Sequence, residues 1–120
     1  MRTLAEIPFF LISSQNITEL GNDVTSRKGS VRAVFGQYKG EEEVTQLCVG
    51  INKETALALG RKHNQESILF VDPWRDAHLV WCKDVKSEHV GKFKKVGKTK
   101  PKGDWTLDVS RGHVYYQVQK

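Results

Sequence analysis

The sequence has only two cysteines and no long apolar run, and the second shortage excludes a membrane-spanning helix. The longest apolar run, residues 7–12, is far shorter than the roughly 20 residues that such a helix needs. The start of the chain also lacks the basic region and the small-residue cleavage site of a signal peptide. We therefore expect a cytoplasmic protein that does not bind membranes.

The two cysteines, Cys48 and Cys82, lie in apolar segments typical of strands. A chain of 120 residues can bury a core of its own and does not need a disulfide. No Cys-x-x-Cys or His-x-x-x-His pair occurs, and His78 and Cys82 would lie ~13 Å apart on an extended strand. We expect two reduced, buried thiols and no metal site.

Motifs of covalent catalysis and of nucleotide binding are missing as well. No local signature places Cys82 or Ser67 at a strained turn as a nucleophile, and no glycine-rich loop joins a strand to a helix. His63 falls on the apolar face of a predicted helix, where packing explains it better than catalysis. We expect no cofactor, and the sequence favours a protein without catalytic activity while leaving an enzyme open.

Length and composition predict a single globular domain over residues 1–120. The chain is 38% hydrophobic and 28% charged, which is typical of a folded protein. Hydrophobic periodicity and turn residues then predict helices and strands. Two helices are predicted over residues 16–26 and 53–63, and strands over 4–12, 30–38, 44–51, 68–71, 77–81, 105–109 and 114–118.

Short turns join these strands in pairs. Asp72 and Pro73 suit the first two positions of a type I turn, so that Trp74 and Arg75 should be exposed at the tip of a hairpin. Pro8 places the first strand at a sheet edge or a bulge. We predict an α+β fold in which two short helices cover one face of a mainly antiparallel sheet built from hairpins. The strand 68–71 should be central and buried.

Positive charge is concentrated in residues 83–103, where eight lysines outnumber two acidic residues. Within this region we expect residues 92–103 to form a mobile, lysine-rich segment. Such a segment suits the phosphates of a nucleic acid, and it also suits a solvated loop. The predicted residues for an anionic surface are Lys92, Lys94, Lys95, Lys98, Lys100, Lys102 and Arg111.

Two other surfaces are candidate sites. Trp74 and Arg75 at the hairpin tip are residue types enriched at protein interfaces, although Trp74 could fold back over the sheet edge. Gln65, Glu66 and Ser67 join the second helix to a strand. They could form a polar ligand pocket, or they could satisfy the free backbone groups where the helix ends.

Residues 43–71 carry a resemblance to a known family. A strand that begins after Glu43, an Ala/Leu-rich helix over 54–63 and the junction Gln65-Glu66-Ser67 resemble a family of small bacterial and phage proteins described only as a domain of unknown function. That family has a Gln-(Glu/Asn)-(Ser/Ala) junction and more often has Glu-Pro-Ser where this chain has Glu43-Val44-Thr45. The resemblance implies a bacterial setting, with the chain encoded by the cell or by a phage, and it implies no activity.

From these features we expect a non-enzymatic interaction module that engages a nucleic acid or a host protein through its electropositive face. The resemblance suggests phage–host interaction or anti-defence as its setting. The alternative is a small-ligand-binding protein or an enzyme that uses the Gln65–Ser67 junction. A pocket lined by convergent polar groups would favour the alternative.

Overall fold

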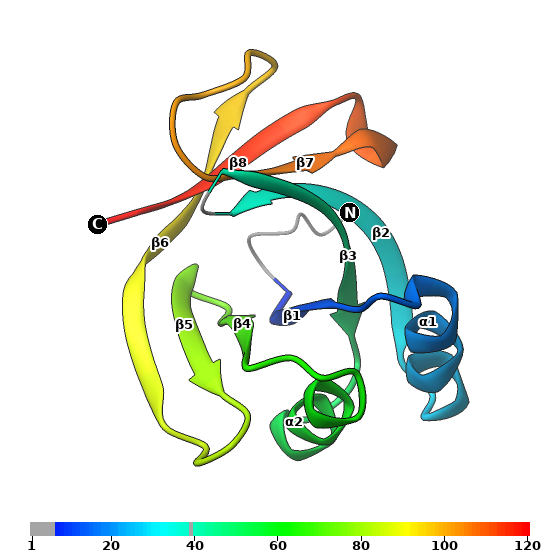
Figure 1. Cartoon of the computed structure of the whole chain (residues 1–120). Helices are drawn as coiled ribbons and strands as arrows, with labels where there is room; N and C mark the ends of the chain where they lie inside the picture. The colour runs from blue at the N-terminus through cyan, green and yellow to red at the C-terminus, as the bar shows by residue number, and fades with distance from the viewer. Residues whose placement is uncertain (1–6, 39) are drawn as a thin grey trace.

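The computed structural model describes residues 7–38 and 40–120, which form a closed barrel of eight antiparallel strands with two helices on its outside (Figure 1). The strand order around the barrel is β1-β3-β2-β7-β8-β6-β5-β4. None of the helices in the described part is long and apolar enough to cross a membrane. The elements are β1 (Phe9–Ser13), α1 (Ile17–Ser26), β2 (Ser30–Tyr38), β3 (Glu41–Val49), α2 (Lys53–Lys62), β4 (Ser67–Val71), β5 (Asp76–Trp81), β6 (Ser87–Gly97), β7 (Trp105–Asp108), the 3-10 turn η1 (Val109–Arg111) and β8 (Val114–Gln119).

Both predicted helices are confirmed, and each begins at a side-chain cap. The Asn16 side chain accepts a hydrogen bond from the backbone N–H of Glu19 at 3.0 Å. Asn52 accepts one in the same way from Thr55 at 2.8 Å. Each cap satisfies a backbone donor that has no partner within the helix.

The three predicted hairpins are confirmed as β2–β3, β4–β5 and β7–β8. In the β4–β5 turn, the Arg75 N–H donates to the Asp72 carbonyl at 3.0 Å, and the Asp72 carboxylate accepts from the Trp74 N–H at 2.9 Å. Arg75 has a φ of 71°, the left-handed conformation that returns the chain into β5. Trp74 is 75% exposed at the tip, as predicted.

The predicted α+β sheet is wrong because the sheet closes on itself. Strand β1 pairs with both β3 and β4, and β2 pairs with β7, so the hairpins join into a barrel. The predicted edge position of the first strand is therefore wrong, and Pro8 lies just before β1. Residues 4–6 of that prediction lie outside the described residues. Closure gives each strand two neighbours, which removes the exposed edges of an open sheet.

Gly91 allows β6 to bend from one neighbour to the next. The first part of β6 pairs with β5 and the second part with β8, with a register shift opposite Ala77 and His78. Gly91 has a φ of 140°, and a Cβ there would lie 2.5 Å from the carbonyl oxygen of Gln119. Only glycine fits this conformation and this close approach.

Two apolar clusters lie on opposite sides of the barrel wall. The outer cluster packs α1 and α2 against the barrel, and it includes both cysteines, which are buried and unpaired as predicted. Burial raises the pKa of the Cys48 thiol to about 12. The inner cluster fills part of the barrel interior with the buried residues Phe9, Val34, Leu47, Val71, Ala77 and Phe93.

Candidate functional site

A pocket of about 740 Å³ lies beside the inner cluster, and its lining includes Leu11, Leu69, Val90 and Tyr116, which pack against that cluster. Side chains alternate between the two faces of a strand, so residues two positions from the inner cluster also face inward. Thus the side chains of Glu43 and Thr45 point to the same side of β3 as Leu47. Those of Ser67 and Leu69 point to the same side of β4 as Val71. The pocket is lined by Leu11, Ser13, Gly36, Gln37, Tyr38, Glu43, Thr45, Asn64, Gln65, Glu66, Ser67, Ile68, Leu69, Leu79, Val90, Gly103, Asp104, Trp105, Thr106, Tyr116, Gln117 and Val118.

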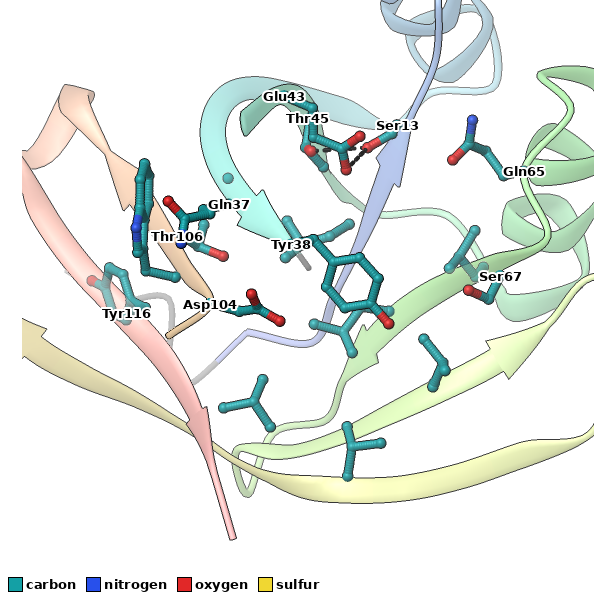
Figure 2. Close-up of a pocket in the computed structure, with 18 of the residues that line it drawn as sticks. Ser13, Gln37, Tyr38, Glu43, Thr45, Gln65, Ser67, Asp104, Thr106 and Tyr116 are labelled. Carbon is teal, nitrogen blue, oxygen red and sulfur yellow. Dashed lines mark hydrogen bonds between the residues drawn. The ribbon is translucent and has the colours of Figure 1, made fainter. Parts of the chain in front are cut away.

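A hydrogen-bonded group from β1 and β3 holds a carboxylate in this pocket (Figure 2). The Ser13 hydroxyl donates to Glu43 Oε1 at 2.8 Å and lies 3.0 Å from the Thr45 hydroxyl. Ser13 and Thr45 are direct partners in the β1–β3 register, so pairing of the two strands brings these groups together. Because Ser13 donates its proton to Glu43, Thr45 must donate to Ser13. One oxygen of the exposed Glu43 carboxylate is thereby anchored to β1.

Strands β2 and β7 bring a tyrosine and a second carboxylate into the same space. Tyr38 ends β2 and is half exposed, and Asp104 directly precedes β7. Figure 2 shows the Tyr38 ring extending across the pocket, with Glu43 above it and Asp104 to its left in this view. In the strand register Gly36 lies between Glu43 on β3 and Thr106 on β7. Since glycine has no side chain, it leaves open space between the two polar groups.

The opposite wall of the pocket is apolar. It is formed by Leu69, Leu79 and Val90, three half-buried residues on β4, β5 and β6. Tyr116 on β8 stacks on Phe93 with ring centroids 5.1 Å apart and an interplanar angle of 11°. Such a surface suits a flat or aliphatic part of a ligand, while the polar wall can fix its orientation.

The charge of the pocket is opposite to that of the whole protein. The chain has a net charge of +5. The pocket is lined by three carboxylates, from Glu43, Glu66 and Asp104, and among its described lining residues none is lysine, arginine or histidine. Within the described residues, no group of three or more histidine, cysteine, aspartate and glutamate side chains is placed to hold a metal ion. All three carboxylates belong to exposed residues, so water partly screens their charge.

The structure brings one predicted group into the pocket and leaves the others outside it. Gln65, Glu66 and Ser67 line the pocket. Trp74 and Arg75 are exposed at the β4–β5 turn and are not among the lining residues. The predicted anion-binding lysines also do not line it: Lys92, Lys94 and Lys95 lie on β6, and Lys98, Lys100 and Lys102 lie in the segment between β6 and β7. Arg111, the last of the predicted anion-binding residues, belongs to η1.

The segment between β6 and β7 nevertheless contributes to the pocket through its end. Gln37 donates to the Gly103 carbonyl at 3.2 Å. Gln117 donates to the carbonyls of Lys102 and Asp104. These bonds from β2 and β8 fix the backbone that carries Asp104 into the pocket.

Sequence reasoning missed Ser13, Tyr38, Glu43, Thr45 and Asp104. The usable signal was the alternation within β3, where Glu43 and Thr45 occupy the same face as the apolar Leu47. Polar residues at inward positions of a strand indicate a lined cavity. That signal could be read only once the inward face of the barrel was known.

His63 is buried and hydrogen-bonded, as expected for a packed histidine. Its Nδ1 lies 2.6 Å from the Ser14 hydroxyl and its Nε2 lies 2.9 Å from Asp23 Oδ2. The hydrogen bond to His63 is the main cause that lowers the pKa of Asp23, and Lys62 adds to it. This network joins the end of α2 to α1 and to the loop after β1.

Comparison with known proteins identifies a family for most of the chain. Residues 13–118 match the family model described as the S-adenosylmethionine lyase family. No curated protein matches the chain. The matched range contains residues 43–71, on which the sequence resemblance rested, but the match does not bear on a bacterial or phage source or on the junction motif.

This match overturns the expected function. A non-enzymatic interaction module for a nucleic acid or a host protein is contradicted, because the matched family is a family of enzymes. The alternative, a small-ligand site or an enzyme, agrees with the match. The lysine-rich surface misled the interpretation because charge at the surface is easy to read in a sequence, whereas a pocket inside a barrel is not.

Proposed function

Since the chain belongs to the S-adenosylmethionine lyase family, we propose that it is an enzyme that binds S-adenosylmethionine in the barrel pocket and breaks one of its carbon–sulfur bonds. The observation that carries this proposal is the charge of the pocket. S-adenosylmethionine has a positively charged sulfonium, an ammonium and one carboxylate, which leaves a net charge of +1. Carboxylates are the only charged groups among the described lining residues.

Glu43 and Tyr38 are the residues that we assign to the sulfonium. A carboxylate attracts the cation directly, and an aromatic ring attracts it through the negative charge of its face. Ser13 and Thr45 hold Glu43 in place before the ligand arrives, so little freedom is lost on binding. Gln65 and Ser67 on the other side of the pocket supply hydrogen-bonding groups for the ribose or the purine.

The apolar wall favours the chemical step as well as binding. Leu69, Leu79 and Val90 offer a surface for the adenine ring and keep water from part of the pocket. Breaking a carbon–sulfur bond of a sulfonium returns the electron pair of that bond to sulfur, which leaves as a neutral thioether. A site with little water favours this step because the positive charge on sulfur disappears.

The carbon that leaves sulfur must receive electrons from within the substrate, because a lyase uses neither water nor a redox partner. Two routes balance. In an elimination, the adjacent carbon loses a proton to a base such as Glu43 and a carbon–carbon double bond forms. In an internal displacement, the substrate's own carboxylate attacks the carbon and closes a ring, and no proton is transferred.

The test is to incubate the purified protein with S-adenosylmethionine and to identify the products by liquid chromatography and mass spectrometry. We expect a neutral thioether nucleoside together with an unsaturated amino acid for elimination or a lactone for displacement. Glu43→Gln should lower the turnover number by at least ~100-fold if Glu43 is the base. In the displacement route it should instead mainly weaken substrate binding.

The matched control is Glu42→Gln. Glu42 is the next residue on β3, it points to the outer face, and its carboxylate lies 3.9 Å from the Lys100 ammonium. Both variants remove one negative charge from the same strand, and only Glu43 reaches the pocket. Equal effects of the two variants, or no thioether product from the wild-type protein, would contradict the proposal.

A further inference from the structure

We infer that His63 is a positioning residue, which through its hydrogen bond to Ser14 holds two walls of the pocket at a fixed separation. One wall is the end of β1, where Ser13 anchors Glu43. The other is the junction between α2 and β4, where Gln65 lines the pocket. The inference rests on the proposed function only for the identity of the ligand, and it adds what prepares the site before the ligand binds.

The ladder between β1 and β4 has a break next to the pocket. Pairing joins Phe9–Leu11 to Leu69–Val71, although β1 continues to Ser13 and β4 begins at Ser67. Continued pairing would place Ser13 opposite Ser67, but within these described strands the register ends before it reaches them. Both serines line the pocket, and Figure 2 shows them on the two separate strands. The strand ladder therefore does not set the width of the wall at this point.

His63 and Ser14 bridge the break. Each is the chain neighbour of a pocket-lining residue, since Ser14 follows Ser13 and His63 precedes Asn64. The Ser14 hydroxyl lies 2.6 Å from His63 Nδ1, although the two residues are 49 positions apart in the sequence. The His63 side chain is only 4% exposed, so water competes little for this hydrogen bond. A side-chain contact thus joins the two walls where the strands do not.

The partners of the His63 ring fix its orientation. The Asp23 carboxylate can only accept a hydrogen bond, so His63 Nε2, which lies 2.9 Å from Asp23 Oδ2, carries the ring proton. In the neutral ring Nδ1 is then an acceptor, and it receives the proton of the Ser14 hydroxyl. The Ser14 oxygen in turn accepts from the Asn16 N–H at 2.9 Å. These bonds hold the ring and the loop after β1 in one arrangement.

The end of α2 connects His63 to the second wall. The Gln65 side chain donates to the His63 carbonyl at 3.2 Å, and the Gln65 N–H donates to the Gly60 carbonyl at 2.8 Å. Asn64 between them has a φ of 59°, the left-handed conformation that ends the helix. Without the bond to Ser14, the closed arrangement becomes only one of several. A ligand must then select it, and the affinity falls in proportion to the fraction of molecules that are closed.

The experiment compares Ser14→Ala with Asp23→Asn, neither of which changes a pocket-lining residue. Ser14→Ala removes the bond across the break. Asp23→Asn is the matched control, because an asparagine carbonyl can still accept from His63 Nε2 and the ring keeps its contact with Ser14. Both variants lose part of the same network, so both should lower the melting temperature. Only Ser14→Ala should affect the site.

Hydrogen exchange of the ligand-free protein, followed by mass spectrometry, tests the bridge itself. The amides of Asn64 and Gln65 donate to carbonyls at the end of α2 and are distant from Ser14 in the sequence. In Ser14→Ala their exchange should become at least ~10-fold faster, because the junction opens more often, whereas Asp23→Asn should change it less than ~3-fold. Saturating S-adenosylhomocysteine, which has no sulfonium to cleave, should restore slow exchange in Ser14→Ala.

Steady-state cleavage of S-adenosylmethionine separates positioning from catalysis. Ser14→Ala should raise KM about 10-fold and change kcat less than ~3-fold, because binding of the substrate closes the walls and the bound complex is the same. The calorimetric Kd of S-adenosylhomocysteine should rise by a similar factor. Asp23→Asn should change neither constant. A role of the network in the chemical step would lower kcat instead.

The outcomes separate this inference from the proposed function. If Ser14→Ala leaves exchange and KM unchanged, or if Asp23→Asn raises KM as much, the inference is wrong and the proposed function stands. Faster exchange with unchanged affinity would also overturn it, since the bridge would then not act on the pocket. If the wild-type protein neither binds nor cleaves these nucleosides, the proposed function is wrong, and exchange alone decides whether the bond holds the junction.

Discussion

Replacing Asp108 with asparagine should lower the free energy of unfolding by about 3 kcal/mol, because it leaves a buried guanidinium without its counterion. Asp108 is fully buried on β7, and its Oδ2 lies 2.9 Å from the Arg32 guanidinium on β2. Breaking a buried ion pair costs about 3–5 kcal/mol. We take the lower end of this range because 29% of the Arg32 side chain is exposed and water can partly solvate it.

Asp108 also makes a second set of contacts, which a double variant removes together with the ion pair. Asp108 Oδ1 also accepts hydrogen bonds from the Ser110 hydroxyl at 2.8 Å and from the Ser110 N–H at 3.2 Å, which caps η1. A double variant, Arg32→Met with Asp108→Leu, removes both charges and this cap. It should lose only ~1 kcal/mol, since apolar residues of similar volume can replace an ion pair and a lost cap costs about that much.

The assay is urea unfolding followed by tryptophan fluorescence, with an unchanged slope of the transition as the check that unfolding remains cooperative. A loss of about 3 kcal/mol would also lower the melting temperature by roughly 12 °C in a domain of this size. The reasoning fails if Asp108→Asn costs less than ~1 kcal/mol. It also fails if the double variant is as unstable as the sum of its single variants, because the two charges would then not be coupled.

Two further predictions concern the pocket and the pH dependence of stability. Gly36→Val should reduce S-adenosylmethionine binding at least ~10-fold in calorimetry, because the larger side chain fills the space beside Glu43. The melting temperature should change little, since a Cβ at this position meets no atom closer than 3.7 Å. Full affinity in a folded variant would contradict this. The pKa of Asp23 is lowered in the folded state, mainly by the His63 hydrogen bond, so the unfolded chain binds the proton first as the pH falls. The stabilisation is present above the unfolded pKa near 4 and is lost as the pH falls through the lower folded pKa. In urea unfolding at a series of pH values, Asp23→Asn should therefore reduce the loss of stability on the acid side of the curve.

Local features of the sequence predicted the local structure. Asn16 and Asn52 marked the starts of both helices, because a short side chain with an acceptor oxygen satisfies the first free backbone donors. Asp72 and Pro73 marked the β4–β5 turn in the same way. These hydrogen bonds join residues two or three positions apart, so the features can be read directly from the chain. The burial of Cys48 and Cys82 followed from their apolar neighbours.

Closure of the barrel and assembly of the pocket depended on contacts between distant parts of the chain. β1 lies between β3 and β4, and β2 pairs with β7, about 70 residues further along the chain. No local pattern indicates which strand pairs with which at such separations, and an open sheet has the same alternation as a closed one. Only the closed arrangement turns Glu43, Tyr38 and Asp104 toward one space. The sequence by itself therefore determined the elements and their hairpins, and the tertiary structure decided that their inner faces enclose a site.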